Sequence, residues 1–415
     1  MRARDPVITG IGVTSAAGVG VEHFWTGLQS GTPRFREVSL FPTDDLPTHV
    51  AGEIGPWTPG FDRVDADRFR VRRTATLARA ALDEATRDAR LGDIRPDRVL
   101  VGTTVGDVAD SEPALRSEAE SGRKPPDGLV VDESLRGRLA RDVGGDVPTE
   151  LYVTACAAGN TALIRGAQLV AGGAADVVVC GGAEGMSRMA FVGFSRMRGM
   201  ARTRCRPFSD ERDGMLLGEG AGFLVVESAD HATRRGATVQ AHVTGYGMTC
   251  DAQHPAAPDP AGTGAARAMA AAVAGTDRSR VDYICAHGTA TPQNDAAEAA
   301  AYQQVFGPAG PPISSIKALI GHSLGAASAI EAVACTLALR HQRTIPQWEL
   351  DGDGTTLDVR LATGDPDDAD QLDLVLNTAF AFGGNNTCVA LERPSGGVAS
   401  GSGPNGSGRV GERPR

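Results

Sequence analysis

Long hydrophobic runs, paired cysteines and lysine are scarce in this chain of 415 residues, and the first two scarcities exclude whole classes of protein. No stretch reaches about 18 uninterrupted apolar residues, so we expect no membrane-spanning helix. The first residues lead straight into a strand-like run and lack the apolar core of a signal peptide. The seven cysteines include no C-x-x-C pair, which favours reduced thiols over a disulfide framework. We therefore expect a cytoplasmic protein that does not act on a membrane.

The charge balance is acidic, and its basic side is almost entirely arginine. The formal net charge of −10 argues against a nucleic acid or an anionic membrane as the main partner. Lys124 and Lys317 are the only lysines among 41 basic residues, so each of them calls for an explanation. The length allows two or three domains, or one large duplicated domain with a sizeable core.

Internal repetition dominates the organisation of the chain. Short Val/Ile/Leu-rich runs alternate with Ala-rich stretches of helical length, which predicts α/β layers with buried strands. Four motifs of the first half return in the same order in the second half, which indicates an ancient duplication. They are Thr9-Gly10-x-Gly12 with Thr244-Gly245-x-Gly247, 101–103 with 287–289, Cys156-x-x-Gly159 with His322-x-x-Gly325, and 224–227 with 389–392.

We divide the chain at residue 240. Residues 1–240 and 241–393 are expected to form the two related halves, and residues 394–415, rich in Gly, Ser, Pro and Arg, a disordered tail. The first half is longer, and its surplus falls at about 42–65 and at 107–148, which we interpret as insertions that form a cap or an interface. Residues 121–128 are typical of an exposed loop, so Lys124 is expected to be a plain surface residue.

Cys156 lies where a nucleophile is expected. Residues 151–154 read as a buried strand, 155–159 as a tight turn and 160–170 as a helix, which places Cys156 at a helix N-terminus. The unpaired N–H groups and the positive end of the helix dipole lower a thiol pKa there, and a thiolate attacks thioesters. Cysteines inside apolar runs are instead expected to be buried and inert; these are Cys180, Cys285, Cys335 and Cys388.

Two histidines also follow strand-like runs. His287 ends the run 283–286, and His322 follows the run that begins at residue 313 and contains Lys317. Ligands collect at the carboxyl ends of strands in α/β folds, so we expect both imidazoles to converge on Cys156.

These motifs resemble the elongating β-ketoacyl-[acyl-carrier-protein] synthases, and the resemblance covers roughly residues 5–392. Within this family, the chain resembles both the type II synthases of fatty-acid elongation and the type II polyketide ketosynthases. The resemblance implies a duplicated thiolase-like fold with five α/β/α/β/α layers. The motifs are Thr154-Ala-Cys156-Ala-Ala-Gly159, Arg206-Pro-Phe208 through Gly222, His287-Gly-Thr-Ala-Thr291 with Asn294 and Asp295, Lys317 to His322 with Glu331, and Phe380-Ala-Phe382-Gly-Gly384.

The resemblance implies a two-stage reaction. Cys156 takes an acyl chain from a phosphopantetheine arm, with its own N–H and that of Phe382 as the oxyanion hole. His287 and His322 then hold a malonyl thioester while it loses CO₂, and the carbanion attacks the acyl-cysteine to give a 3-ketoacyl thioester. Neither a metal nor an organic cofactor is implied, because the substrates are carried on the phosphopantetheine of an acyl carrier protein.

Several supporting residues follow from the same resemblance. Lys317 is expected to pair with Glu331 and tune the histidines, and Thr289 and Thr291 to bind the phosphopantetheine amides. Phe382 and Gly383 belong to a gate between the acyl pocket and the malonyl site. Ala381 stands where the family usually has glycine, which narrows the backbone angles open to that gate and leaves the acyl-chain length open.

Partners are implied as well. The acidic carrier protein needs a basic docking face on this acidic chain. The first candidate is Arg68, Arg70, Arg72 and Arg73, before an amphipathic helix at 74–87; the second is Arg196, Arg198, Arg202, Arg204 and Arg206. The resemblance implies a homodimer, or a heterodimer with a chain-length-factor-like subunit, with the Cys156 region near the interface.

Other interpretations stay open at this point. The same residues suit an acyltransferase that moves the acyl group to oxygen, nitrogen or sulfur without decarboxylation. A non-catalytic chain-length-factor-like subunit would lack the nucleophile. Gly321-His-Ser-Leu-Gly325 also spells a serine-hydrolase elbow, but the acid and base available after Ser323 lie on its own outgoing helix. Between the pathways, the unusual 107–148 segment favours polyketide or other specialised synthesis over housekeeping fatty-acid synthesis.

Overall fold

The computed structural model describes residues 2–122, 135–142, 145, 147–350, 354–363 and 371–394. Lys124, most of the expected loop at 121–128 and residues 395–415 of the expected tail lie outside this part of the chain. No helix within it is long and apolar enough to cross a bilayer.

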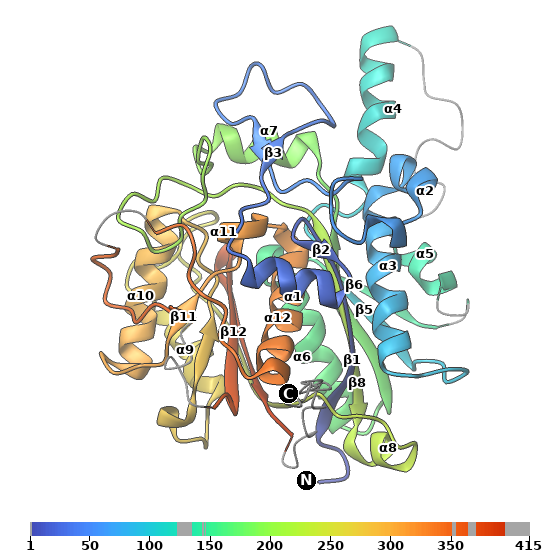
Figure 1. The fold of residues 1–415 in the computed structure, drawn as a ribbon, viewed down its shortest axis with the longest axis vertical. Helices are drawn as coiled ribbons and strands as arrows, with labels where there is room; N and C mark the ends of the chain where they lie inside the picture. Colours follow the sequence, from blue (N-terminus) through green and yellow to red (C-terminus); the bar gives the residue numbers. More distant parts are fainter. Residues whose placement is uncertain are drawn as a thin grey trace, which may run out of the picture.

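A large mixed sheet runs through the molecule and repeats one strand order twice (Figure 1). Residues 1–240 contribute β1 (Pro6–Ser15), β5 (Arg98–Gly102), β6 (Thr149–Tyr152), β7 (Val177–Glu184) and β8 (Gly220–Ser228). Residues 241–393 contribute β9 (Ala241–Cys250), β10 (Tyr283–Cys285), β11 (Ile313–Ser314), β12 (Leu374–Ala381) and β13 (Asn385–Glu392). The spatial order is β11-β10-β12-β13-β9-β1-β8-β7-β5-β6, so each half runs third, second, fourth, fifth, first. The two halves meet where β1 and β9 pair at Val7–His242 and Ile8–Ala241.

Helices cover both groups of strands and fill the space between them. α6 (Ala158–Ala171) and α12 (Ala327–His341) form the middle layer, packed against each other and against strands of both halves. α3 (Arg73–Asp88) covers the outer face of the first half, and α9 (Thr263–Ala272) and α10 (Pro292–Phe306) lie on the outer side of the second (Figure 1). The expected five-layered, thiolase-like duplication is confirmed.

The repeated Thr-Gly-x-Gly motif explains how the outer helices pack. A Cβ on Gly10 or Gly12 of β1 would lie 2.3 or 2.0 Å from a carbonyl oxygen of α3. A Cβ on Gly245 or Gly247 of β9 would lie 1.9 or 2.0 Å from a carbonyl oxygen of α9. In both halves the glycines therefore let a helix approach its strand more closely than any side chain allows.

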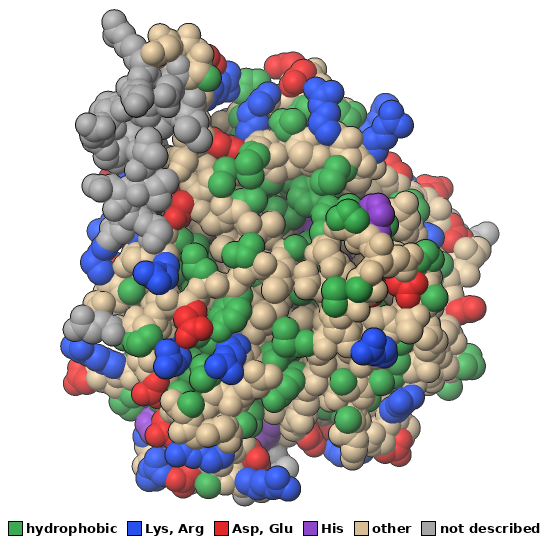
Figure 2. All heavy atoms as spheres, turned by 180° about the vertical axis from the view of Figure 1, so that it is seen from behind, with side chains coloured by type: hydrophobic (Ala, Val, Ile, Leu, Met, Phe, Trp, Pro, Cys, Tyr) green, Lys and Arg blue, Asp and Glu red, His purple; other side chains and the backbone are tan. Residues whose placement is uncertain are grey.

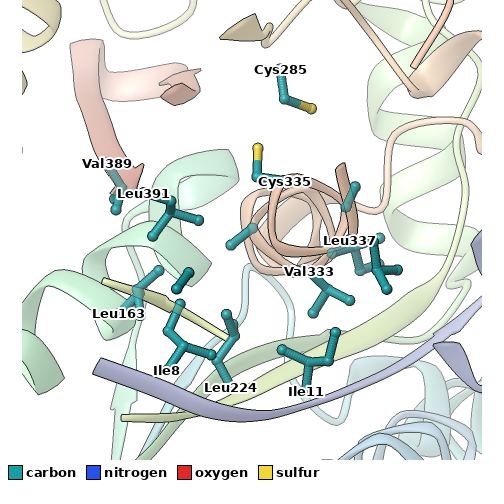
Figure 3. Packing of buried hydrophobic residues seen from close by; sticks show 14 of the residues in the cluster. Ile8, Ile11, Leu163, Leu224, Cys285, Val333, Cys335, Leu337, Val389 and Leu391 are labelled. Carbon is teal, nitrogen blue, oxygen red and sulfur yellow. The ribbon is translucent and has the colours of Figure 1, made fainter. Parts of the chain in front are cut away.

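The core lies around α12, where the two halves meet. Every residue of α12 from Ala327 to Leu339 is buried, and Val333 and Leu337 pack with Ile11 and Leu391 from opposite halves (Figure 3). Cys285 and Cys335 are buried in the same cluster, as expected for inert cysteines. Burial on all sides explains why α12 is rich in small residues and has no polar face.

Strand β6 differs from its prediction. It begins two residues early, at Thr149, and it ends the strand order, so it is an edge strand. Leu151 and Val153 are 37% and 66% exposed, and the expectation of a buried strand is wrong in this free chain. A strand at the edge of a sheet presents unpaired N–H and C=O groups with which another chain can pair.

The remaining elements lie mostly at the ends of the strands. The segment at 107–148 contains helices in its described parts: α4 (Val108–Ser121) projects from the body, and α5 (Leu135–Asp142) packs on α3 (Figure 1). The others are β2 (Gly18–Val19), α1 (Val21–Gln29), β3 (Arg36–Glu37), β4 (Val50–Ala51), α2 (Ala66–Val71), α7 (Arg188–Arg196), α8 (Ala229–Arg234) and α11 (Lys317–Ile320).

Candidate active site

Cys156 sits in a strained turn between β6 and α6. It belongs to the short 3₁₀ turn Ala155–Ala157, directly before the first residue of α6. Ala155 has a φ of 49°, a left-handed conformation that costs energy for a residue with a Cβ. The turn leaves the Cys156 side chain 7% exposed and places it in the wall of a cavity.

The structure brings both histidines to this thiol. His287 lies two residues after the end of β10, and His322 lies two residues after the end of α11, next to Gly321. His322 Nε2 lies 2.9 Å from Cys156 Sγ, and the two imidazole rings meet edge to face with centroids 5.3 Å apart. One ligand-type atom from each of the three side chains lies within 4.8 Å of the other two.

Protonation in the free protein differs from the expectation for Cys156. Burial raises the pKa of its thiol to about 12, although the Lys317 ammonium opposes this rise. The expected lowering of the pKa at the helix N-terminus is therefore outweighed by desolvation. Burial, reinforced by Lys317, lowers the pKa of His287 and of His322 well below the ordinary value. The resting site thus holds a thiol beside two neutral imidazoles.

Lys317 lies behind the histidines, in the expected pair with Glu331. Its ammonium forms a short contact with the Glu331 carboxylate and donates to the His287 carbonyl oxygen at 2.6 Å. Its Nζ is 3.5 Å from His287 Nδ1. Burial alone would lower the Lys317 pKa, but the neighbouring carboxylate raises it, so the buried lysine stays charged.

Sequence reasoning missed the acid that holds His287. Glu298 of α10 accepts from the His287 and Gly288 N–H groups at 2.8 and 2.7 Å and from the Thr378 hydroxyl at 3.0 Å. Burial raises the pKa of Glu298 to about 7. A buried glutamate in an alanine-rich helix three residues after Asp295 was the available signal in the sequence.

Glu184 at the end of β7 was missed as well, and it ties the two halves together. Its carboxylate accepts from the N–H groups of Thr104 and Val105 and the hydroxyl of Thr103, in the loop after β5. It also accepts from the Gly325 N–H, in the turn after His322. One buried carboxylate thus fixes this turn against a loop of the first half.

A cavity of about 600 Å³ leads to the three side chains. Thr289 and Thr291 line it, with their hydroxyls 2.9 Å apart. Phe382 also lines it, 38% exposed, and its ring lies 5.6 Å from that of Phe194. Gly383, next in the gate segment, has a φ of 81° and donates its N–H to the Pro255 carbonyl oxygen. The cavity combines an apolar side with hydroxyls, as small-molecule binding sites commonly do.

The geometry suits hydrogen bonding better than metal binding. Two ligands on a tetrahedral zinc ion, one sulfur and one nitrogen, lie roughly 3.6 Å apart. The 2.9 Å between Cys156 Sγ and His322 Nε2 is instead a hydrogen-bond distance. The charged Lys317 beside His287 also opposes a cation at this place.

The serine-nucleophile interpretation finds no support. Ser323 is buried, and its Oγ has no hydrogen-bond partner among the residues that the structure describes. A serine nucleophile needs a base in contact with its hydroxyl.

The candidate docking arginines are scattered. Arg68 is exposed, whereas Arg73 is buried against Glu219, so including Arg73 in a docking face was wrong. Arg73 was predicted to be a surface residue because Glu219, the partner that buries it, lies 146 positions away in the sequence. Arg206 is 16% exposed and paired with Glu211 and Asp213, so it presents little free surface. Arg198 lines the cavity, Arg72 is half-buried, and the Arg70 side chain is outside the described part.

Comparisons with known proteins agree on one family. The profile "Beta-ketoacyl synthase, N-terminal domain" matches residues 3–232, and "Beta-ketoacyl synthase, C-terminal domain" matches residues 240–351. A Staphylococcus aureus 3-oxoacyl-[acyl-carrier-protein] synthase 2 is 33% identical over 408 residues, which cover 93% of this chain and 98% of that protein. A Synechocystis protein of the same name is also 33% identical, over 93% of this chain and 97% of its own.

Solved structures give the same result. The ishigamide ketosynthase/chain length factor is 35% identical with a TM-score of 0.85, over 95% of this chain and all of that one. A β-ketoacyl synthase from Burkholderia phymatum is 28% identical with a TM-score of 0.80, over 94% of this chain and all of its own. A ketosynthase solved with its type II polyketide acyl-carrier protein is 27% identical, also with a TM-score of 0.80, over 95% of this chain and all of that one.

Proposed function

Because the chain belongs to the β-ketoacyl synthase family of condensing acyltransferases, we propose that it is a 3-oxoacyl-[acyl-carrier-protein] synthase with Cys156 as its nucleophile. Enzymes of this family use carrier-bound phosphopantetheine and no separate cofactor. The observation that carries the proposal is the 2.9 Å contact between Cys156 Sγ and His322 Nε2, beside His287, in a cavity with an apolar side and two threonine hydroxyls.

In the first stage, Cys156 exchanges its proton for an acyl group. Sγ attacks the carbonyl carbon of the acyl thioester as its proton passes to His322 Nε2, the ring nitrogen in contact with it. The Cys156 and Phe382 N–H groups stabilise the oxyanion. The bond from the acyl carbon to the pantetheine sulfur then breaks, and His322 returns the proton to the leaving thiolate. A thiol pKa of about 12 makes this proton transfer necessary, because little thiolate exists beforehand.

In the second stage, a malonyl thioester loses CO₂. Once Cys156 is acylated, His322 takes the tautomer that is protonated on Nε2, so that the Nε2–H groups of His287 and His322 donate to the thioester oxygen. The bond to the carboxylate then breaks as negative charge moves onto that oxygen. The Lys317 ammonium, 3.5 Å from His287 Nδ1, favours that charge electrostatically. The enolate carbon attacks the acyl carbon on Cys156, Sγ leaves as a thiolate, and a 3-ketoacyl thioester results. The thiolate then takes up one proton from solvent, which restores the resting thiol.

Two partners belong to the proposal. An acyl carrier protein would dock near the cavity that Arg198 lines, and the exposed Arg68 is a second candidate contact. A second copy of the chain would cover the β6 edge, where Leu151 and Val153 are exposed. Seen from behind, the molecule has hydrophobic side chains gathered over the middle of its face and more Lys and Arg toward the edges (Figure 2).

We propose a polyketide-type or other specialised pathway for this enzyme. The ketosynthases of known structure that resemble the chain support this assignment, as does its unusual segment at 107–148. The curated relatives named 3-oxoacyl-[acyl-carrier-protein] synthase 2 are compatible with fatty-acid synthesis instead.

Half-reactions test the proposal. Wild type and Cys156→Ala are incubated with acyl-carrier thioesters and then with malonyl carrier, while intact mass and CO₂ are followed. Acylation that needs Cys156, followed by CO₂ release and a 3-ketoacyl product, supports the synthase. Acylation without CO₂ release, in which only an alcohol, an amine or another thiol removes the acyl group from the enzyme, supports the acyltransferase. Failure to be acylated by any acyl chain supports a non-catalytic subunit.

A further inference from the structure

Three buried polar side chains that the proposed mechanism does not use meet behind the Cys156 turn. They are Asn160 of α6, Ser328 of α12 and Asn377 of β12, all fully buried. The Asn377 side-chain amide donates to Asn160 Oδ1 at 2.9 Å and to the Ser328 carbonyl oxygen at 2.7 Å. Buried amides and hydroxyls are costly unless they are paired, so a cluster of this kind fixes the relative positions of its elements.

The Ser328 hydroxyl caps the start of α6. Asn160 is the third residue of this helix, so its N–H has no partner within α6 and would reach the carbonyl oxygen of Cys156, four residues earlier, only if the helix extended back through the turn. Instead it donates to Ser328 Oγ at 2.9 Å, and Ser328 Oγ donates to the Cys156 carbonyl oxygen at 3.2 Å. One hydroxyl from another helix is thus inserted between the nucleophile turn and α6.

Close packing makes this insertion possible. A Cβ on Gly159 would lie 2.5 Å from the Ala329 nitrogen and 2.9 Å from Ser328 Oγ, so glycine lets the start of α12 reach the turn. α12 begins shortly after His322 and carries Glu331, the partner of Lys317, one turn beyond Ser328. The same helix therefore holds the peptide of the nucleophile and the counter-ion of the lysine.

We propose that Ser328 is a positioning residue for Cys156, an inference that rests on the proposed function. By keeping the Cys156 carbonyl out of the α6 hydrogen-bond ladder, its hydroxyl holds Sγ toward His322 and the Cys156 N–H toward the thioester oxygen. Without the hydroxyl, the Asn160 N–H and the Cys156 carbonyl oxygen pair directly. The turn then winds into α6, and both catalytic groups move away from the thioester.

The test separates positioning from folding by measuring two steps. Ser328→Ala and the similarly sized Ser328→Cys are compared with the wild type by rapid-quench intact mass, which gives the rate of Cys156 acylation. CO₂ release is then measured in a single turnover on enzyme that has already been acylated. Thr336→Val is the matched control, because it removes a buried hydroxyl of α12 whose one hydrogen bond, among the residues that the structure describes, is to the Ala332 carbonyl oxygen of its own helix.

We expect both Ser328 variants to acylate about ten-fold more slowly or worse, while CO₂ release from acylated enzyme stays within about two-fold of the wild type. The control should stay within about two-fold in both steps. Unchanged acylation in Ser328→Ala would overturn the inference, as would an equal fall in both steps together with a lower unfolding midpoint. A wild type that is not acylated at all contradicts the proposed function instead.

Discussion

At the scale of single residues, the site combines a protonated thiol with a charged lysine in one buried volume. Burial raises the Cys156 pKa to about 12, yet Lys317 keeps its charge because Glu331 balances it. The neutral imidazoles between them supply the proton acceptor that the thiol lacks. The lysine and its carboxylate are therefore a supporting pair, which makes them a target for substitution.

Removing the charge of Lys317 should destabilise the protein strongly. Lys317→Met leaves the buried Glu331 carboxylate without its cation, and we expect a loss of about 3–5 kcal/mol in the free energy of unfolding, measured with urea. Adding Glu331→Gln to the same chain removes the unpaired charge and should restore most of that stability. Equal stability of the single and double variants would show that the pair is not coupled.

Glu184 should give the stability a pH dependence of known sign. Burial raises the pKa of its carboxyl from 4.5 to about 7, so the native state holds this proton more tightly than the unfolded state does. Its contribution to stability is therefore present below about pH 4.5 and falls as the pH rises through 7. Glu184→Gln cannot ionise, so the variant should gain on the wild type by up to roughly 3 kcal/mol between pH 4.5 and 8. Urea unfolding at both ends measures the difference, and a constant difference would contradict the account.

Residues whose role depends on a distant partner were the hardest to find in the sequence. Cys156, His287, His322 and Lys317 follow strand-like runs or carry chemistry that is rare in this chain, so local pattern located them. Glu184 and Ser328 take their importance from partners 141 and 172 positions away, which no local pattern encodes. The prediction that Arg73 belongs to a docking face was wrong for the same reason, because Glu219, the partner that buries it, is distant in the sequence.

At the scale of elements, the two inner helices carry the site. α6 begins just after the nucleophile turn, and α12 begins just after the His322 turn, so the match between Cys156-x-x-Gly159 and His322-x-x-Gly325 reflects two equivalent turns. Sequence pattern predicted both turns, whereas it misplaced β6, because exposure at a sheet edge depends on which strand is last.

Gly159→Ala tests the contact between these helices. Its Cβ would meet the backbone of α12 at 2.5 Å, and we expect a loss of about 1–3 kcal/mol in unfolding free energy together with slower Cys156 acylation. Gly193→Ala in α7 is the control, since its Cβ meets nothing within 4 Å and alanine favours a helix. Similar stability of the two variants would show that α6 and α12 are less tightly packed than described.

At the scale of the whole molecule, repeated motifs predicted the duplication, whereas the dimer was expected only from the family resemblance. Ordered repeats in the sequence implied two related halves, and the strand order repeats accordingly. The division at residue 240 stays a prediction. The dimer stays a prediction too, because a surface between chains leaves no periodic signal of its own in the sequence.

Val153→Asp tests the proposed dimer. Val153 is 66% exposed beside the β6 edge, and a carboxylate there would have to be buried if a second copy covers the strand. We expect a wild-type dimer and a variant monomer by light scattering at equal concentration. Met248→Asp, at an exposed apolar residue of β9, should leave the dimer intact. A monomeric wild type, or a dimer that survives Val153→Asp, would contradict this assembly.

The measurement that tests the central claim most directly follows mass and CO₂ together. Wild type and Cys156→Ala are each mixed with an acyl-carrier thioester and then with malonyl carrier. The account predicts that the wild type alone gains the mass of the acyl group, that CO₂ appears on addition of malonyl carrier, and that the acyl mass leaves as a 3-ketoacyl thioester. Acylation of Cys156→Ala, or loss of the acyl group from the wild type without CO₂, would contradict it.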